Sequence, residues 1–374
     1  MLLKRNNRIL KIVAVLILVV AIAIGGLYLY SSYQMSKIPS MTFEDMLQYT
    51  TEDNEEARIT VGILNEGKMS YTVYGNNGKV LPQKEYIYEI GSLTKTFTTS
   101  LLSKAISEGK ISLEDQIDQY LSLPEMDYFP TLKRLVTHTS GYENDYFDWQ
   151  MAANFFDGQD NSFYGITIES LLNKVGEVNL SNKDYPYEYS NFGISVIGQV
   201  LSEIYGEKYH SLMNKYILKD LQMNDTRISV QLRDVLGTWQ WKDNDAYQPA
   251  GAIVSDISDM MTYLELHMSE TLPYLSMTHG AISETDDGNT KFNLQMGMRI
   301  DAVGMGWMID KENELIWHNG GTTDSNNCYF AFDKTRGIGV VILSNLAPNY
   351  RIPATVMGPK LIKTLQQKDV PQHR

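Results

Sequence analysis

Two neighbouring segments of the chain, residues 57–64 and 68–75, alternate hydrophobic and polar positions. A period of two is typical of a strand with one buried face, and the Asn-Glu-Gly sequence between the segments is a turn signal. We therefore expect these two segments to form a β-hairpin.

Residues 92–110 follow a helical period instead. Apolar residues recur at spacings of three and four, and Gly109 stands where the pattern ends, so the segment predicts one helix that begins near Ser92. The apolar stripe of this helix consists of Leu93, Phe97, Leu101, Leu102 and Ala105.

Helical patterns and loops dominate from about residue 113 to residue 274, and strand patterns then return. Strands are predicted at 314–321, 326–333 and 337–345, followed by a helix at 354–368. Strands near both ends with helices between them predict an α+β fold. We expect an antiparallel sheet built from the two ends of the chain, flanked by helices, with an inserted all-helical lobe and a cleft at the junction.

The first segment of the chain differs from the rest. Residues 12–30 contain no charge over 19 positions, about the length of a bilayer-spanning helix, and four basic residues precede them. The basic flank should stay cytoplasmic. We therefore expect residues 1–34 to be a cytoplasmic flank with a transmembrane signal-anchor, and residues 35–374 to be an extracytoplasmic domain at the cell membrane.

A cleaved signal peptide is the alternative interpretation of this segment, because Ala21-Ile22-Ala23 could serve as a cleavage site. The apolar run continues past that site to Tyr30, which favours an uncleaved anchor.

Composition excludes several classes of function. The formal net charge of the 374 residues is −13, which argues against binding to nucleic acid. Cys328 is the only cysteine, so no internal disulfide is expected, and its strand pattern predicts a buried thiol. The six histidines do not pair at metal-ligand spacing, so neither a metal nor a cofactor is expected.

Ser92 and Lys95 are the first candidates for chemistry. Residues three apart share a helix face, so the amine can reach the hydroxyl. A serine needs a base to become nucleophilic, and a lysine acts as a base only when its surroundings lower its pKa. The alternative role for Ser92 is a helix cap. The same pattern recurs at Ser107 and Lys110, where the helix ends and solvated surface is expected.

Two further signals follow in chain order. Tyr189 and Asn191 stand in a loop before a predicted helix, and His318 lies on a predicted strand that ends at Gly320 and Gly321. With "GSLTKTFT", "LKRLVTHTSGY", "PAGAIVSDISDM" and "GMGWMID", the chain resembles the penicillin-binding protein and serine β-lactamase superfamily. Within it, the chain is similar to the class C β-lactamase and D-alanyl-D-alanine peptidase branch. The resemblance covers nearly everything after residue 40.

The resemblance implies a role for each of these residues. Ser92 would be acylated, Lys95 would be its base, and Tyr189 would relay the proton to the leaving group. Asn191 would hold Lys95 and the substrate amide. The backbone N–H groups of Ser92 and Gly321 would form the oxyanion hole.

The strand motif of His318, Gly320 and Gly321 would line the bound substrate. Class C β-lactamases typically have lysine at the position of His318. A histidine can be neutral near pH 7, which argues against a dedicated β-lactamase.

The expected function is a membrane-anchored extracytoplasmic serine hydrolase that acts on D-amino-acid amides or esters of the cell envelope. By resemblance, its substrate is a peptidoglycan stem peptide or D-alanylated teichoic acid. The alternatives are β-lactam hydrolysis and a penicillin-binding sensor or scaffold that does not turn over.

Overall fold

The computed structural model describes residues 25, 33, 35–228, 230, 238–269 and 271–368. Two compact units divide the chain, Met1–Met46 and Leu47–Arg374. The expected membrane helix at residues 12–30 lies outside the described residues, apart from Gly25. Within the described ranges, no helix has both the length and the apolar character needed to cross a bilayer.

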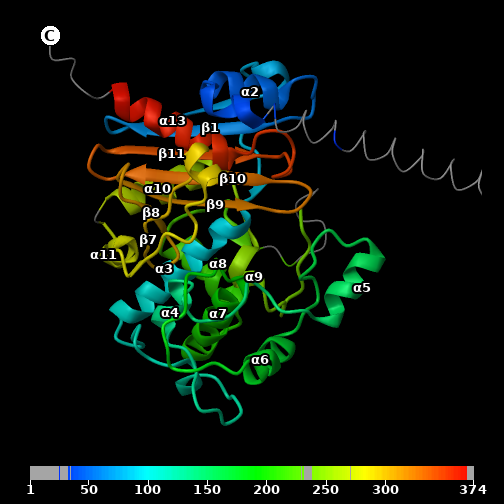
Figure 1. The fold of residues 1–374 in the computed structure, drawn as a ribbon, viewed down its shortest axis with the longest axis vertical. Coiled ribbons are helices and arrows are strands. Elements are labelled where there is room, and N and C mark those ends of the chain that lie inside the picture. Colours follow the sequence, from blue (N-terminus) through cyan, green and yellow to red (C-terminus); the bar gives the residue numbers. More distant parts are fainter. Residues whose placement is uncertain are drawn as a thin grey trace, which may run out of the picture. The chain divides into compact units, whose positions relative to one another are not determined.

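An eight-stranded antiparallel sheet is the framework of the larger unit, with the order β2-β1-β11-β10-β9-β8-β7-β6 (Figure 1). The expected hairpin is confirmed, because β1 pairs with β2. β1 also pairs with β11, so strands from both ends of the sequence lie side by side as predicted. The strands of this sheet are β1 (Ile59–Asn65), β2 (Lys68–Tyr74), β6 (Ser283–Glu284), β7 (Ala302–Val303), β8 (Met308–Asp310), β9 (Leu315–Gly321), β10 (Asn327–Asp333) and β11 (Ile338–Ser344).

Helices cover both faces of this sheet, which explains the continuous apolar sequences of its central strands β10 and β11. Tyr329 of β10 faces α13 (Ala354–Lys368), where a Cβ on Gly358 would lie 1.9 Å from its ring. The next residue, Phe330, faces the other way and packs 5.7 Å from the ring of Tyr263 in α10 (Ile257–Met268).

The segment between β2 and β6 is mostly helical, but it is not the all-helical lobe that the sequence predicted. Three short strands, β3 (Tyr88–Glu89), β5 (Ile253–Ser255) and β4 (Arg227–Ile228), form a second antiparallel sheet in that order. They are too short for alternation to be read from the sequence. The other helices are α2 (Phe43–Thr51), α3 (Thr94–Ser107), α4 (Leu132–Val136), α5 (Trp149–Asp157), α6 (Ile168–Glu177), α7 (Asn191–Tyr205), α8 (Tyr209–Lys219), α9 (Gln248–Gly251), α11 (Pro273–Ser276) and α12 (Lys291–Gln295). The short 3₁₀ turns are η1 (Ile38–Ser40), η2 (Asn76–Gly78), η3 (Gly91–Leu93), η4 (Ile117–Gln119) and η5 (Met277–His279).

The predicted helix at 92–110 corresponds to η3 and α3, and between Thr94 and Ser103 it is buried on all sides rather than on its apolar stripe alone. Its hydroxyl side chains satisfy their hydrogen bonds inside the protein. Thr98 donates to the Pro249 carbonyl at 2.7 Å, and Thr99 donates to the Met305 carbonyl at 2.8 Å. A helix with buried hydroxyls on every side is thereby fixed to α9 and to the loop before β8.

Candidate active site

Ser92 lies in η3, the turn that joins β3 to α3. Its Oγ is 3.0 Å from Lys95 Nζ, one turn along the chain. The N-cap residue of α3 is Leu93, and no side chain caps that helix end. Ser92 therefore does not serve as the helix cap, and its hydroxyl faces the lysine.

Lys95 has no exposed surface. Its Nζ contacts two oxygens, Ser92 Oγ at 3.0 Å and the Ala250 carbonyl at 2.8 Å. Among the described residues, no carboxylate forms an ion pair with it. Burial holds the pKa of Lys95 well below its ordinary value, because a buried ammonium loses its hydration. The neutral amine can donate one hydrogen to Ala250 and accept the proton of Ser92.

Tyr189 completes this arrangement from the loop before α7. Lys95 Nζ lies 4.9 Å from the centre of its ring. Burial raises the pKa of the Tyr189 phenol, and an interaction with the Ser92 side chain opposes that rise. The phenol therefore stays protonated at neutral pH, beside both Ser92 and Lys95.

Asn191 is placed differently from the expectation. It is the first residue of α7, and its backbone N–H donates to Asn144 Oδ1 at 3.4 Å. Its side chain makes no hydrogen bond to Lys95. The Ala250 carbonyl of α9 occupies that role instead, and a backbone carbonyl has no side-chain signal in a sequence.

Gly320 and Gly321 bring β9 directly against the serine turn. A Cβ on Gly320 would lie 1.9 Å from the Ile90 carbonyl oxygen, and a Cβ on Gly91 would lie 2.6 Å from Gly321 N. Side chains at these positions would separate the two backbones.

The same contact brings two backbone N–H groups close together. The Thr322 N–H donates to Asn326 O of the β10 side at 2.9 Å. Along an antiparallel strand, successive N–H groups point alternately toward and away from the neighbouring strand. The Gly321 N–H therefore points away from β10 and toward the serine turn. The N–H of Ser92 belongs to a helix start, where donors are free. The N–H donors of Ser92 and Gly321 therefore lie on two backbone segments that are in contact.

His318 is fully buried, with its ring centre 6.3 Å from that of Tyr189. Burial, with a smaller contribution from Lys95, lowers the pKa of His318 to about 3. Nδ1 lies 2.6 Å from the Asn319 carbonyl, which assigns the hydrogen to Nδ1. Nε2 is then an acceptor, and it has no hydrogen-bond partner in the described part of the chain.

His138 is a site residue to which the sequence assigned no role. Its ring centre lies 4.8 Å from that of Tyr189, and its Nδ1 accepts a hydrogen bond from the Ser190 N–H at 3.1 Å. Burial lowers the pKa of His138 to about 3. Its φ of +57° places it in the left-handed region. The sequence "THTSGY" is rich in turn-forming residues and marks this position. The packing of His138 against Tyr189 is visible only in the folded structure.

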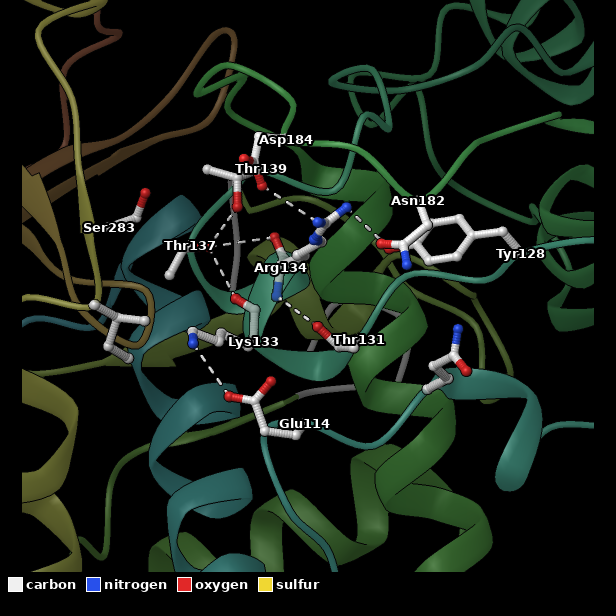
Figure 2. Close-up of a pocket in the computed structure, with 12 residues that line it drawn as sticks. Glu114, Tyr128, Thr131, Lys133, Arg134, Thr137, Thr139, Asn182, Asp184 and Ser283 are labelled. Carbon is white, nitrogen blue, oxygen red and sulfur yellow. Dashed lines mark hydrogen bonds and ion pairs between the residues drawn. The ribbon is translucent and has the colours of Figure 1, made fainter.

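A concavity adjoins the loop that carries His138 and is drawn in Figure 2. Thr137 and Thr139, which flank His138, line it, but Ser92 does not. Its cations are already paired: Lys133 contacts Glu114 at 3.1 Å, and Arg134 contacts an exposed aspartate, Asp184, at 3.4 Å. No group of three or more His, Cys, Asp or Glu side chains is placed to hold a metal ion anywhere in the described chain.

Comparisons with known proteins show which family the sequence and the fold resemble. The family model for Beta-lactamase matches residues 44–355. The chain is 23% identical over 308 residues to Protein flp of Staphylococcus aureus strain MW2, covering 77% of this chain and 57% of that protein. It therefore spans little more than half of the length of Protein flp. It is 24% identical over 350 residues to a β-lactamase of Pseudomonas fluorescens, covering 83% of this chain and 93% of that protein.

Two solved structures show the same fold. A β-lactamase/D-alanine carboxypeptidase from Yersinia pestis, complexed with citrate, superposes with a TM-score of 0.69 at 17% identity, over 90% of this chain and 99% of that one. An octameric penicillin-binding protein homologue from Pyrococcus abyssi gives 0.65 at 19% identity, over 83% of this chain and 73% of that one.

Proposed function

Because the chain belongs to the β-lactamase family, whose fold supports serine acyl-enzyme chemistry, we propose that it hydrolyses D-amino-acid amides or esters of the cell envelope. The observation that carries this proposal is the 3.0 Å contact between Ser92 Oγ and the buried amine of Lys95. We further propose that residues 12–30 anchor the enzyme in the cell membrane with its catalytic unit outside.

Acylation starts when Lys95 takes the proton of Ser92 as Oγ attacks the substrate carbonyl. The negative charge on the carbonyl oxygen is held by the N–H groups of Ser92 and Gly321. The C–O or C–N bond then breaks, and Tyr189 passes a proton to the departing oxygen or nitrogen while Lys95 restores the phenol. Water next attacks the acyl-serine ester, and its proton returns through the same groups to Ser92 Oγ.

His318 supports an ester or amide without a carboxylate next to the scissile bond. A cation at this position would attract such a carboxylate, whereas His318 is neutral above a pH of about 3. Its acceptor nitrogen has no partner in the described chain but is buried, so it would accept a hydrogen bond from a substrate donor only after the surrounding side chains shift. A D-alanyl ester on teichoic acid brings an ammonium group and has no carboxylate beside the scissile bond. The terminal D-alanine of a stem peptide carries a carboxylate there, so the neutral His318 favours the ester.

The direct test is release of D-alanine from D-alanylated teichoic acid and from stem peptides. We expect the wild-type protein to release it and Ser92→Ala to lose the activity completely. Ser107→Ala is the matched control, since Ser107 belongs to the second Ser-x-x-Lys pattern and bonds only the Lys104 carbonyl at the end of α3. Release by Ser92→Ala, or none by the wild-type protein from either polymer, would overturn the proposal.

β-Lactam hydrolysis is the second candidate, because a relative and a structural neighbour are named as β-lactamases. The substitution His318→Lys tests whether the histidine disfavours carboxylate-bearing substrates such as penicillins. If the neutral histidine disfavours carboxylates, the lysine variant should be acylated faster by a fluorescent penicillin, relative to a D-alanyl ester. Rapid loss of label from the wild-type protein would favour a β-lactamase, and a stable label would favour a D-alanyl peptidase or a penicillin-binding sensor.

A further inference from the structure

Glu89 is a buried carboxylate, 3% exposed, in the short strand β3. Four donors converge on it. The Trp239 N–H bonds its Oε1, and three side chains of the turn between β9 and β10 bond its Oε2. These three donors are Thr322 Oγ1 at 2.9 Å, Ser325 Oγ at 2.9 Å and Asn326 Nδ2 at 3.2 Å.

Burying a carboxylate is costly, and in this case no basic side chain of the described chain pairs with it. Burial raises the pKa of Glu89, and the four hydrogen bonds offset only part of that rise. A neutral side chain would close an ordinary turn without this cost. The cost of burying this carboxylate indicates that its hydrogen bonds serve to fix the turn between β9 and β10.

The two ends of this hydrogen-bond cluster lead directly to the two oxyanion donors. Thr322 follows Gly321 in the chain, and Glu89 precedes the Ile90-Gly91-Ser92 turn. Between them, the backbones of Gly91 and Gly321 are in contact, and the Cys328 thiol donates to the Ile90 carbonyl at 3.2 Å. One carboxylate thus joins the segment that carries the Ser92 N–H to the segment that carries the Gly321 N–H.

We propose that Glu89 is a positioning residue that sets the separation of the two oxyanion-hole donors. Such donors stabilise a transition state only when both lie at hydrogen-bond distance from the developing oxyanion, so a shift of a fraction of an ångström matters. Glu89 itself does not touch the substrate. The inference rests on the acyl-Ser92 chemistry proposed above and not on the choice of D-alanyl substrate.

The test compares a tetrahedral adduct with an ordinary substrate. Phenylboronic acid adds to a reactive serine and places an oxygen where the oxyanion forms. We expect Glu89→Gln to weaken its binding about 10- to 100-fold and to lower kcat for p-nitrophenyl acetate by a similar factor, with KM within about threefold. A glutamine has the same shape as glutamate. Its amide N–H₂ group cannot accept hydrogen bonds, so it faces the donors without bonding them.

Two further variants keep the test decisive. Ser325→Ala removes a single donor from a partly exposed residue, so it should fold and should weaken boronate binding about two- to fivefold. Asp310→Asn is the matched control: Asp310 is another buried carboxylate, held by Asn313 at the end of β8. It should lower the stability of the fold without changing boronate affinity.

Equal boronate affinity in the wild-type protein, Glu89→Gln and Ser325→Ala would overturn the positioning role. The same weakening in Asp310→Asn would also overturn it, because the effect would then belong to stability in general. If the wild-type protein does not bind the boronate at all, the acyl-serine chemistry fails, and the inference fails with it.

Discussion

Lys95 shows how a single residue sets the reactivity of the site. An ammonium in its position would be buried without a carboxylate partner in the described chain, which costs several kcal/mol. The amine avoids that cost by giving up its proton, and the neutral form is the one that can activate Ser92. The same burial that destabilises the charged side chain therefore makes it a base.

Replacing Lys95 by methionine should separate its catalytic role from its structural one. We expect acylation to fall by about 10³-fold or more, because the base is lost. The free energy of unfolding should stay the same or increase, since methionine fills a similar volume without a polar group. Acylation kinetics measure the rate, and urea unfolding measures the free energy of unfolding, on the same preparation of the variant.

The control for this variant is Lys104→Met on the same helix. Lys104 is partly exposed and pairs with Glu108 and Asp220, so its loss should lower stability by at most about 1 kcal/mol and leave acylation unchanged. Retained acylation in Lys95→Met would contradict the assignment of the base.

At the scale of elements, α5 reverses the usual arrangement of an amphipathic helix. Its buried residue is Asn154, whose Nδ2 donates to the Ser162 and Tyr164 carbonyls at 2.9 and 2.8 Å. Its aromatic residues face outward: Trp149, Phe155 and Phe156 are 81%, 80% and 84% exposed. Figure 1 shows the helix projecting from the helical segment. The hydrogen bonds of Asn154, together with the partly buried Met151, attach this element to its unit.

This arrangement predicts stability effects opposite to those expected from hydrophobicity. Asn154→Ala should lower the free energy of unfolding by about 1–2 kcal/mol, because it leaves partly buried carbonyls without donors. Phe156→Ser, on the same helix, should change it by no more than about 0.5 kcal/mol. Urea unfolding measures both, and a larger loss for Phe156→Ser than for Asn154→Ala would show that the aromatic face is buried in solution.

At the scale of the whole molecule, the sequence predicted the elements in which hydrophobic residues recur at a regular spacing. Alternation identified the hairpin and the late strands, and the helical period located α3. Chain order and local context identified Ser92, Lys95 and Tyr189, which the fold brings together. The two-residue strands β3 and β4 were missed because they are too short to show a period.

The remaining features of the site depend on contacts that have no local pattern. The Ala250 carbonyl, the positive φ of His138 and the hydrogen bonds of Glu89 each join segments far apart in the chain. The side chain of Asn191 was expected at Lys95 from resemblance alone, and the described hydrogen bonds do not include that contact.

Buried histidines make the stability of the catalytic unit depend on pH. His267 and His279 lie 2.7 Å apart between Nδ1 and Nε2, packed against Trp307. Burial lowers the pKa of His279 to about 3, like those of His138 and His318, and it lowers the pKa of His267 well below its usual value. All four are therefore neutral in the folded protein at neutral pH.

The sign of the effect follows from linkage. Below the ordinary histidine pKa of 6.5, the unfolded chain binds protons that the folded protein excludes, so acid favours unfolding. Stability should be complete above pH 6.5 and should fall by about 1 kcal/mol per pH unit for each such histidine between pH 6 and pH 4. Urea midpoints at several pH values measure the slope. His279→Phe, which keeps a ring among aromatic neighbours, should reduce it, and an unchanged slope would exclude the pair as a source.

The pairing of β1 with β11 has a consequence for how the protein is made. Arg58, at the start of β1, bonds Asn345, 287 positions later. On the ribosome, Ser92 and Lys95 emerge long before Gly321 and the strands that complete their surroundings. A growing polypeptide therefore holds an inert serine until translation is almost finished. A product that stops before residue 338 would leave β1 with an open edge, able to pair with other unfinished chains.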